Sequence, residues 1–215
     1  MKAKTRGRLS IQPALFIFKG VKDLPLNMAY LKSEKTAAGD EVYTPFYAVD
    51  PLLEFIPKDK KIWCPFDESW SAFYQTFAEK GYQVTKSAIN DGQDFFEYLP
   101  PDGFDIIISN PPFSKKDKVL ERLYALEKPF AMLLPVSTIQ ARGRFRLFRK
   151  GLELLIFDGR VDYHTRQNFT EFTKGVHFGS AYFCRNFLPE KLVFRKLQKY
   201  QRPLKREGVV TKCLG

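Results

Sequence analysis

Cysteine and histidine are scarce in this chain of 215 residues. The three cysteines, Cys64, Cys184 and Cys213, lie far apart, and the only histidines are His164 and His177. This spacing argues against a zinc site, and a few isolated thiols are typical of a reducing cytosol. The apolar run "ALFIF" near the N-terminus is too short for a signal peptide or a membrane span. We therefore expect a cytoplasmic protein with no metal and no membrane partner.

Acidic side chains are outnumbered by basic ones. The chain has 35 Lys and Arg but 24 Asp and Glu, which gives a formal net charge of +11. This excess favours an anionic partner, because cations that neutralise a phosphate backbone release its counterions. We therefore expect nucleic acid as the partner, and the sequence leaves the oligomeric state open. Aromatic residues make up 15% of the chain, enough to supply both a core and flat surfaces for a planar ligand.

The composition of the chain changes near residue 40. Residues 1–40 begin with a basic stretch and end in "KSEKTAAGD", which is typical of a linker. We predict that they form an N-terminal extension. Residues 41–215 are numerous enough to bury a core of their own, so we expect one domain there.

Strand-like segments alternate with helical ones throughout this predicted domain. Strands are expected at 60–67, 82–89, 104–109, 130–136, 152–157, 159–164 and 178–185. The alternation predicts an α/β fold, a three-layer, doubly wound and mostly parallel sheet with helices on both faces. The closing strands have no clear helix between them, which predicts an antiparallel edge hairpin.

Local signals predict where the helices begin and end. Ser69 is the expected cap of a helix that Gly81 terminates. Ser114 and Asp117 have the spacing of a capping box for a second helix. A third, basic helix is expected over "ARGRFRLFRKG".

Two proline-containing turns follow predicted strands. They are "CPFD" at residues 64–67 and "NPPF" at residues 110–113. In α/β sheets, ligands bind beyond the carboxyl ends of the strands, near the point where the strand order reverses. The two turns therefore mark the expected site. The plain alternative for "NPPF" is a rigid turn, because two prolines fix the backbone and end the strand.

"NPPF" at Asn110–Phe113 resembles the catalytic motif of S-adenosylmethionine-dependent methyltransferases that act on exocyclic amino groups, chiefly the adenine-N6 enzymes of DNA and RNA. With "DGQDFFEY" and "FGSAYFCR", residues 41–187 look most similar to small phage or prophage members. The resemblance implies a Rossmann-like class I methyltransferase fold and S-adenosylmethionine as cofactor. It also implies a catalytic set of Asn110, Pro111, Pro112 and Phe113.

The chemistry of amino-group methylation explains these residue types. The amino lone pair of adenine is delocalised into the ring, so the nitrogen is a poor nucleophile. Two fixed acceptors, the side-chain oxygen of Asn110 and the carbonyl of Pro111, would hold both N–H groups and free the lone pair. Phe113 would stack on the base after it leaves its helix.

The resemblance also implies a set of cofactor-binding residues. Asp67 would accept a hydrogen bond from the cofactor's ammonium group, and Asp94 and Phe95 would bind its adenine. The alternatives are that Asp67 caps a helix and that Phe95 belongs to the core. The full predicted set is Tyr43, Thr44, Pro45, Pro65, Phe66, Asp67, Asp94, Phe95 and Asn110.

Some of these residues also fit a plainer role, and parts of the family's pattern are absent. Thr44 and Pro45 would touch the methionine end of the cofactor, but they also fit a simple helix start, as cap and first-turn proline. The turn after Asp67 lacks the family's glycines, and Ser87 and Ala88 stand where an acid that binds the ribose is expected. These departures leave open an inactive, methyltransferase-like module that binds nucleic acid.

Basic residues follow both the "NPPF" turn and the strand at 130–136. Lys115, Lys116, Arg142 and Arg144 are the predicted substrate contacts, together with Phe113. Arginines interleaved with Phe145 and Phe148 suit a nucleic-acid surface. The alternative is a helix whose phenylalanines face the core and whose arginines face solvent. The two histidines are expected to be structural or loop residues.

The leading interpretation is adenine-N6 methylation of DNA, with DNA preferred over RNA by analogy with phage proteins. Methylation of an RNA adenine or of a protein glutamine is the alternative within the same class, since a glutamine amide offers a similar planar NH₂ group.

Overall fold

The computed structural model describes residues 42–165, 168–172, 176 and 178–206. The predicted extension at residues 1–40 lies outside this part of the chain, as do His177 and Cys213. The division into an extension and one domain therefore stays a prediction. No helix among the described residues is both long and apolar enough to cross a membrane.

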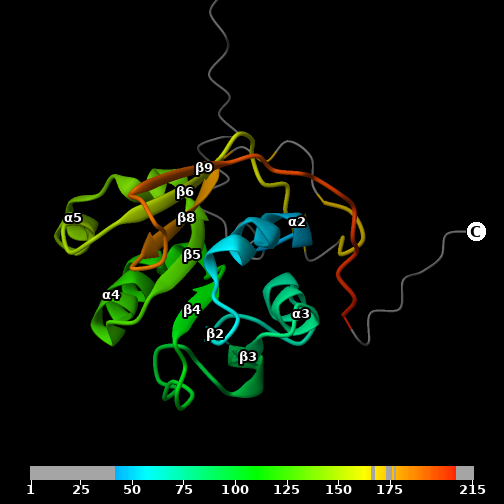
Figure 1. Ribbon diagram of the computed structural model, residues 1–215, viewed down its shortest axis with the longest axis horizontal. Coiled ribbons are helices and arrows are strands. Elements are labelled where there is room, and N and C mark those ends of the chain that lie inside the picture. Colours follow the sequence, from blue (N-terminus) through cyan, green and yellow to red (C-terminus); the bar gives the residue numbers. More distant parts are fainter. Residues whose placement is uncertain (1–41, 166–167, 173–175, 177, 207–215) are drawn as a thin grey trace, which may run out of the picture.

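A sheet of seven strands forms the centre of the molecule (Figure 1). Its order is β3-β2-β4-β5-β8-β6-β9, and only β8 runs antiparallel to its neighbours. The strands are β2 (Lys61–Cys64), β3 (Gln83–Lys86), β4 (Ile106–Ser109), β5 (Phe130–Pro135), β6 (Glu153–Phe157), β8 (Ser180–Arg185) and β9 (Leu192–Arg195). The predicted mostly parallel α/β sheet is confirmed. The antiparallel pair with no helix between its strands is β6 and β8, and β9, which was not predicted, adds an edge strand outside it.

A second, two-stranded sheet lies beside the large one. Its strands are β1 (Val42–Tyr43) and β7 (His164–Thr165), which pair in antiparallel fashion. Val42 lies opposite Thr165, and Tyr43 lies opposite His164. This pairing fixes the first described residues against a segment more than 100 positions later in the chain.

Helices cover both faces of the large sheet, as the three-layer prediction requires (Figure 1). One face carries α2 (Phe46–Val49), which continues into the 3₁₀ helix η2 (Asp50–Phe55), and α3 (Ala72–Glu79). The other face carries α4 (Lys116–Leu126) and α5 (Arg142–Phe148). Shorter 3₁₀ turns are η3 (Ile89–Asp91), η4 (Phe113–Lys115) and η5 (Val136–Ile139).

The central strands are buried on both sides. In β4, Ile106 and Ile108 pack under α2 and α3, whereas Ile107 between them packs under α4. The side chains of a strand point alternately to the two faces, so a strand covered on both faces must be apolar throughout. This is why "FDIIIS" and "FAMLLPV" are continuously apolar.

Two helix starts differ from the predicted ones. The turn Glu68–Ser71 is closed by a hydrogen bond from the Ser71 amide to the Glu68 carbonyl (3.0 Å), so α3 begins after Ser71 and not after Ser69. The helix α2 begins at Phe46, which makes Pro45 the residue before the helix. The predicted C-terminal end of α3 is confirmed: Gly81 has a φ of 77°, and its amide donates to the Ala78 carbonyl.

The predicted capping box at Ser114 and Asp117 is wrong. The 3₁₀ turn η4 occupies residues 113–115, so α4 begins at Lys116, and no side chain caps it from the preceding position, Lys115. Asp117 pairs with Arg144 of α5 instead.

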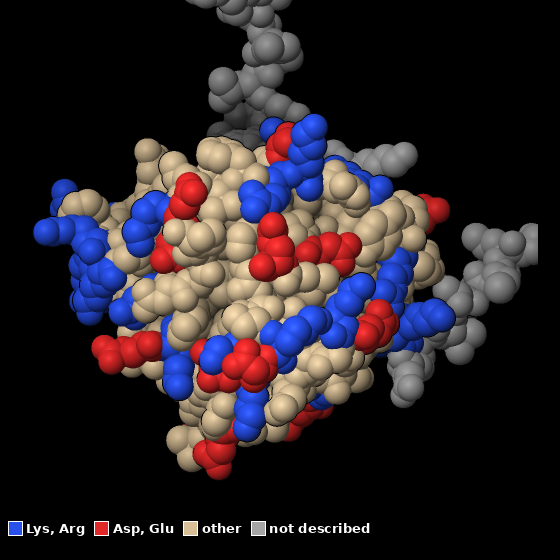
Figure 2. Space-filling view, in the orientation of Figure 1, with Lys and Arg blue, Asp and Glu red and all other residues tan. Residues whose placement is uncertain are grey.

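Charged side chains cover the surface unevenly. Basic and acidic groups are interspersed over much of the face in Figure 2, but basic groups gather at the left, where Figure 1 places α5. This cluster lies on the same side of the sheet as α4.

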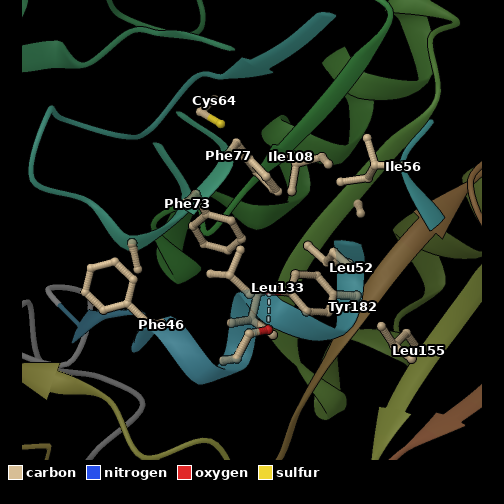
Figure 3. Close-up of a cluster of buried hydrophobic side chains, with 14 of the residues drawn as sticks. Phe46, Leu52, Ile56, Cys64, Phe73, Phe77, Ile108, Leu133, Leu155 and Tyr182 are labelled. Carbon is tan, nitrogen blue, oxygen red and sulfur yellow. Dashed lines mark hydrogen bonds between the residues drawn. The ribbon is translucent and has the colours of Figure 1, made fainter. Parts of the chain in front are cut away.

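Aromatic rings and aliphatic side chains pack together in the core on the α2–α3 face (Figure 3). Phe46, Phe73 and Tyr182 are almost fully buried there. The rings of Phe73 and Tyr182 meet edge to face, with their centroids 6.3 Å apart. The Tyr182 hydroxyl donates a hydrogen bond of 2.9 Å to the carbonyl of Ala48, which ties β8 to α2.

Replacing Tyr182 by phenylalanine tests this tie. The Tyr182→Phe change keeps the ring but takes the hydroxyl donor from a buried carbonyl, so we expect the free energy of unfolding to fall by about 1–2 kcal/mol. Urea denaturation measures it. Tyr74→Phe, on the half-buried side of α3, is the matched control and should have little effect. Equal losses in both variants would contradict the assigned tie.

Candidate active site

The two predicted turns meet at one edge of the sheet, the edge formed by the carboxyl ends of its parallel strands. Strands β2 and β4 are parallel neighbours, with Ile62 opposite Ile106. Their carboxyl ends lead into Pro65-Phe66-Asp67 and Asn110-Pro111-Pro112, respectively. The Ser109 hydroxyl at the end of β4 donates a short hydrogen bond to the Asp67 carboxylate. This contact joins the two turns at the point where the strand order reverses.

The Asn110 side chain is oriented by the small sheet. Its amide nitrogen Nδ2 lies 3.4 Å from the Val42 carbonyl, to which it donates. Its oxygen Oδ1 is shielded from solvent and has no hydrogen-bond partner among the described residues. A buried acceptor without a partner costs free energy, so each such group in a folded protein needs a physical explanation. A ligand that supplies a donor is one such explanation.

Two cavities adjoin Asn110. They share four lining residues, Val42, Tyr43, Phe66 and Asn110. The larger has a volume of about 300 Å³, and the smaller about 40 Å³. The larger is also lined by Pro65, Glu68, Ala88, Ile89, Asn90, Asp94, Phe95, Phe96, Pro111, Pro112 and Lys115. The smaller is also lined by Thr44, Asp67, Trp70, Ser71, Ala72, Phe73 and Leu204.

Polar groups converge on the smaller cavity. The Thr44 hydroxyl is buried and has no hydrogen-bond partner among the described residues. Asp67 is also buried, and burial raises the pKa of its carboxyl to about 7, against the opposing effect of hydrogen bonds with Ser109 and Ser71. With the free oxygen of Asn110, these groups make a site of three convergent polar side chains.

Aromatic groups form a wall of the larger cavity. Phe95 is only 2% exposed, and its ring centroid lies 4.8 Å from that of Phe66 and 5.7 Å from that of Trp63. The Asp94 carboxylate accepts from the amide of Phe96 at 3.0 Å. Phe95 therefore belongs to the core and also lines the cavity, so core packing and ligand binding are compatible roles for it.

Phe113 and Pro45 are the members of the predicted catalytic and cofactor-binding sets that line neither cavity. Phe113 packs edge to face on Phe178 and Tyr163, with centroids 5.6 and 6.3 Å apart, and lines neither cavity. Pro45 also lines neither, and its neighbour Tyr43 lines both. Tyr43 stacks on Phe169, with centroids 5.1 Å apart.

The predicted substrate contacts separate into two groups. Lys115 lines the larger cavity, Lys116 donates from Nζ to the Phe113 carbonyl at 3.1 Å, and Arg142 is exposed at the start of α5. Arg144, in contrast, is only 7% exposed; it pairs with Asp117 and donates from Nε to the Thr138 carbonyl at 2.7 Å. The expectation that Arg144 contacts substrate is therefore corrected, because its guanidinium is already bonded within the protein.

Glu68, Trp70 and Leu204 were not predicted as site residues. The Glu68 carboxylate accepts from the Trp70 indole at 2.8 Å and from the Asn90 amide at 2.7 Å, and it lines the larger cavity. Its position directly after "CPFD", the predicted cofactor turn, could have identified Glu68 as a site residue from the sequence. Leu204 reaches the smaller cavity from the segment after β9, and nothing in its local sequence indicates this.

His164 and Ser87 are two further polar residues that are buried away from both cavities. His164 is buried against Phe172, with ring centroids 5.5 Å apart, and burial lowers its pKa. Ser87 is buried and accepts from the Trp63 indole at 3.0 Å, so it does not replace the missing acid. The described residues contain no cluster of three potential metal ligands.

Comparison with known proteins adds two distant structural neighbours. No protein-family model matches the sequence, and no curated protein matches it significantly. A Listeria monocytogenes protein assigned to the class I S-adenosylmethionine-dependent methyltransferases matches over 81% of this chain and 72% of its own, with 14% identity and a TM-score of 0.44. A release-factor-specific protein-(glutamine-N5) methyltransferase from Alicyclobacillus acidocaldarius matches over 64% of this chain and 86% of its own, with 17% identity and a TM-score of 0.32.

Similarity at this level does not carry a function, and the fold is assigned from the sheet itself. Strands β3 and β4 lie on either side of β2, and the reversed strand β8 lies between β5 and β6. This is the strand arrangement of the class I methyltransferase fold.

The buried Asp67 carboxyl predicts an unusual dependence of stability on pH. Its folded-state pKa is about 7, above the ordinary value of 3.8. The folded state therefore favours the protonated acid, and this stabilisation is complete below pH 4 and is lost as the pH rises through 7. We expect a loss of up to roughly 4 kcal/mol from this group.

Urea denaturation between pH 4 and pH 8 measures this effect. Asp67→Asn replaces the carboxyl by a neutral group of the same size that still accepts from Ser109, so the difference between the variant and the wild type isolates Asp67. We expect the wild type to lose stability relative to the variant as the pH rises. Parallel curves would show that Asp67 titrates normally.

Proposed function

We propose that this protein is an S-adenosylmethionine-dependent methyltransferase that modifies an exocyclic amino group, the N6 amino group of adenine in DNA. The observation that carries the proposal is the unpartnered oxygen of Asn110, held at the wall that both cavities share. Its nitrogen is used by Val42, so the oxygen is the part of the side chain left for a donor.

The side chains around the two cavities fit the cofactor by type. Asp67 and the Thr44 hydroxyl, in the smaller cavity, suit the ammonium group of its methionine end. Phe66, Phe95 and Asp94, in the larger cavity, suit a purine ring and its amino group. Tyr43 and Pro65 would complete the walls, and Pro45 would act by placing Thr44. When bound, S-adenosylmethionine supplies an electrophilic methyl group.

The residues of this chain would act on the methyl acceptor. The Asn110 oxygen accepts one N–H of the target amino group, and the Pro111 carbonyl accepts the other. Both acceptors are fixed in advance, since Val42 holds the Asn110 amide and two prolines restrict the backbone. Preorganised acceptors of this kind favour the pyramidal nitrogen over the planar one. The proton is lost from an already cationic nitrogen, so no strong base is needed nearby.

Phe113 would meet the target base only after a change in its surroundings. It now packs between Tyr163 and Phe178. These are aromatic contacts of the kind a base can join or replace, and an adenine removed from its helix offers a flat ring for this purpose. The basic groups Lys115, Lys116 and Arg142 would contact the neighbouring phosphates.

An inactive nucleic-acid-binding module is the second candidate. It is favoured by the smaller cavity, whose volume of about 40 Å³ is enough for a water-sized group and too small for an amino-acid end. Leu204 and Trp70 form part of its wall, and some part of this wall must move before the methionine end can enter. An active enzyme therefore requires this wall to open.

Replacing Asn110 by alanine separates the two candidates. Without the oxygen acceptor, we expect Asn110→Ala to lower methyl transfer to DNA at least a hundredfold, as loss of a preorganised polar group does in other active sites. Transfer is measured with isotopically labelled S-adenosylmethionine, and the product nucleoside is identified as N6-methyladenine by mass spectrometry. DNA affinity should change little.

Asn186→Gly is a matched control for this substitution. Asn186 follows β8 at the opposite edge of the sheet and has a φ of 50°, which glycine adopts without strain. It should retain full transfer. The proposal is wrong if Asn110→Ala transfers within tenfold of the wild type, or if the wild type methylates neither DNA nor RNA.

A further inference from the structure

The helix α5 presents an unusual mixture of side chains to solvent. Arg144 and Leu147 form its buried face. Phe145 is 65% exposed, although phenylalanine at a helical position normally faces the core. The expected arrangement, with phenylalanine inside and arginine outside, is thus reversed at positions 144 and 145.

Arg144 holds α5 beside the "NPPF" turn. Its guanidinium pairs with Asp117 in the first turn of α4 and donates to the carbonyl of Thr138. Asp117 follows Phe113 by only four residues, so the tie places the beginning of α5 next to the beginning of α4. Because β5 and β4 are parallel neighbours, η5 and α5 also follow the same sheet edge as Asn110.

Exposed cations lie in and beside α5 and at the start of α4. Only one of these cations makes an ion pair among the described residues: Arg146 pairs with Glu121. The guanidinium of Arg149 lies 5.9 Å from the centroid of the Phe145 ring. We name this group the basic rim; it consists of Lys115, Lys118, Arg142, Phe145, Arg146, Arg149 and Lys150.

We propose that the basic rim is the surface on which a polynucleotide docks, with its phosphates on the cations and one unpaired base stacked on Phe145. The proposal rests on the proposed function, since the rim lies on the edge where the target base would enter. Figure 2 shows basic groups gathered over α5, whereas acidic and basic groups are mixed over much of the remaining visible face.

The combination of residues favours this partner over others. A polynucleotide needs both repeated cations for its backbone and a flat apolar group for a base, and the rim supplies both. An acidic protein surface would need the cations but not an isolated exposed ring. The exposed side chains Val136 and Ile139 of η5 extend the apolar part of the same edge.

The salt dependence of binding tests the cations. Fluorescence anisotropy with short labelled single-stranded DNA and RNA, between about 50 and 200 mM salt, gives the slope of log affinity against log salt concentration. Each lost phosphate contact on a single strand should lower the steepness by about 0.7. The double variant Arg142→Ala/Arg149→Ala should therefore lower it by about 1.4.

The control removes the same charge from the opposite side of the sheet, where the parallel strands begin. Lys58 and Lys60 precede β2, whose other end carries the candidate site. Lys58→Ala/Lys60→Ala should leave the slope unchanged. Equal changes in the two double variants would overturn the proposal, because they would indicate nonspecific attraction by net charge.

Phe145→Ala tests the stacking contact separately. Loss of a stacked base should weaken single-strand binding about fivefold or more, with an unchanged salt slope. An unchanged affinity would remove Phe145 from the interface. Circular dichroism of the variant checks that α5 and the fold are retained, as expected for an exposed side chain.

Two further measurements keep this proposal distinct from the catalytic one. Polynucleotide binding through the rim by a wild type that transfers no methyl group would contradict the proposed function and support the docking surface. Binding to phosphatidylserine vesicles that is lost in Arg142→Ala/Arg149→Ala, with no binding to DNA or RNA, would overturn the docking surface in favour of a membrane.

Discussion

The parallel pairing of β2 with β4 is the constraint on which the candidate site depends. It brings the ends of two strands that are more than 40 residues apart to the same edge of the sheet. The hydrogen bond from Ser109 to the buried Asp67 then joins the two turns. The free oxygen of Asn110 can serve both cavities only because this pairing places it between them.

A second set of contacts fixes what surrounds this edge. The pairing of β1 with β7 places the Val42 carbonyl within reach of the Asn110 nitrogen, and so determines which atom of that side chain stays free. On the other side, Arg144 and Asp117 hold α5 to α4. This ion pair joins the buried Arg144 to the exposed Asp117. It fixes the position of α5 and leaves the remaining cations of that helix facing outward.

Much of this arrangement was predictable from local sequence. The apolar strands, their parallel order and the meeting of "CPFD" with "NPPF" follow from periodicity and from the rule that ligands bind at strand ends. The role of Arg144 did not follow, because its partner Asp117 lies 27 residues earlier and helical periodicity favours phenylalanine as the buried residue. Leu204 and β9 were missed for the same reason: distant pairing decides their positions. Whether the predicted residues act in catalysis stays a prediction.

The central claim is that the two cavities bind S-adenosylmethionine despite a turn without glycines and a narrow inner cavity. Calorimetric titration of the cofactor-free protein with S-adenosylmethionine, and with its demethylated product, tests this most directly. The account predicts micromolar binding of both, weakened in Asp67→Asn, which would show that the inner cavity opens to admit the methionine end. Absence of binding, also with DNA or tRNA present, would contradict the account and favour an inactive module that binds nucleic acid.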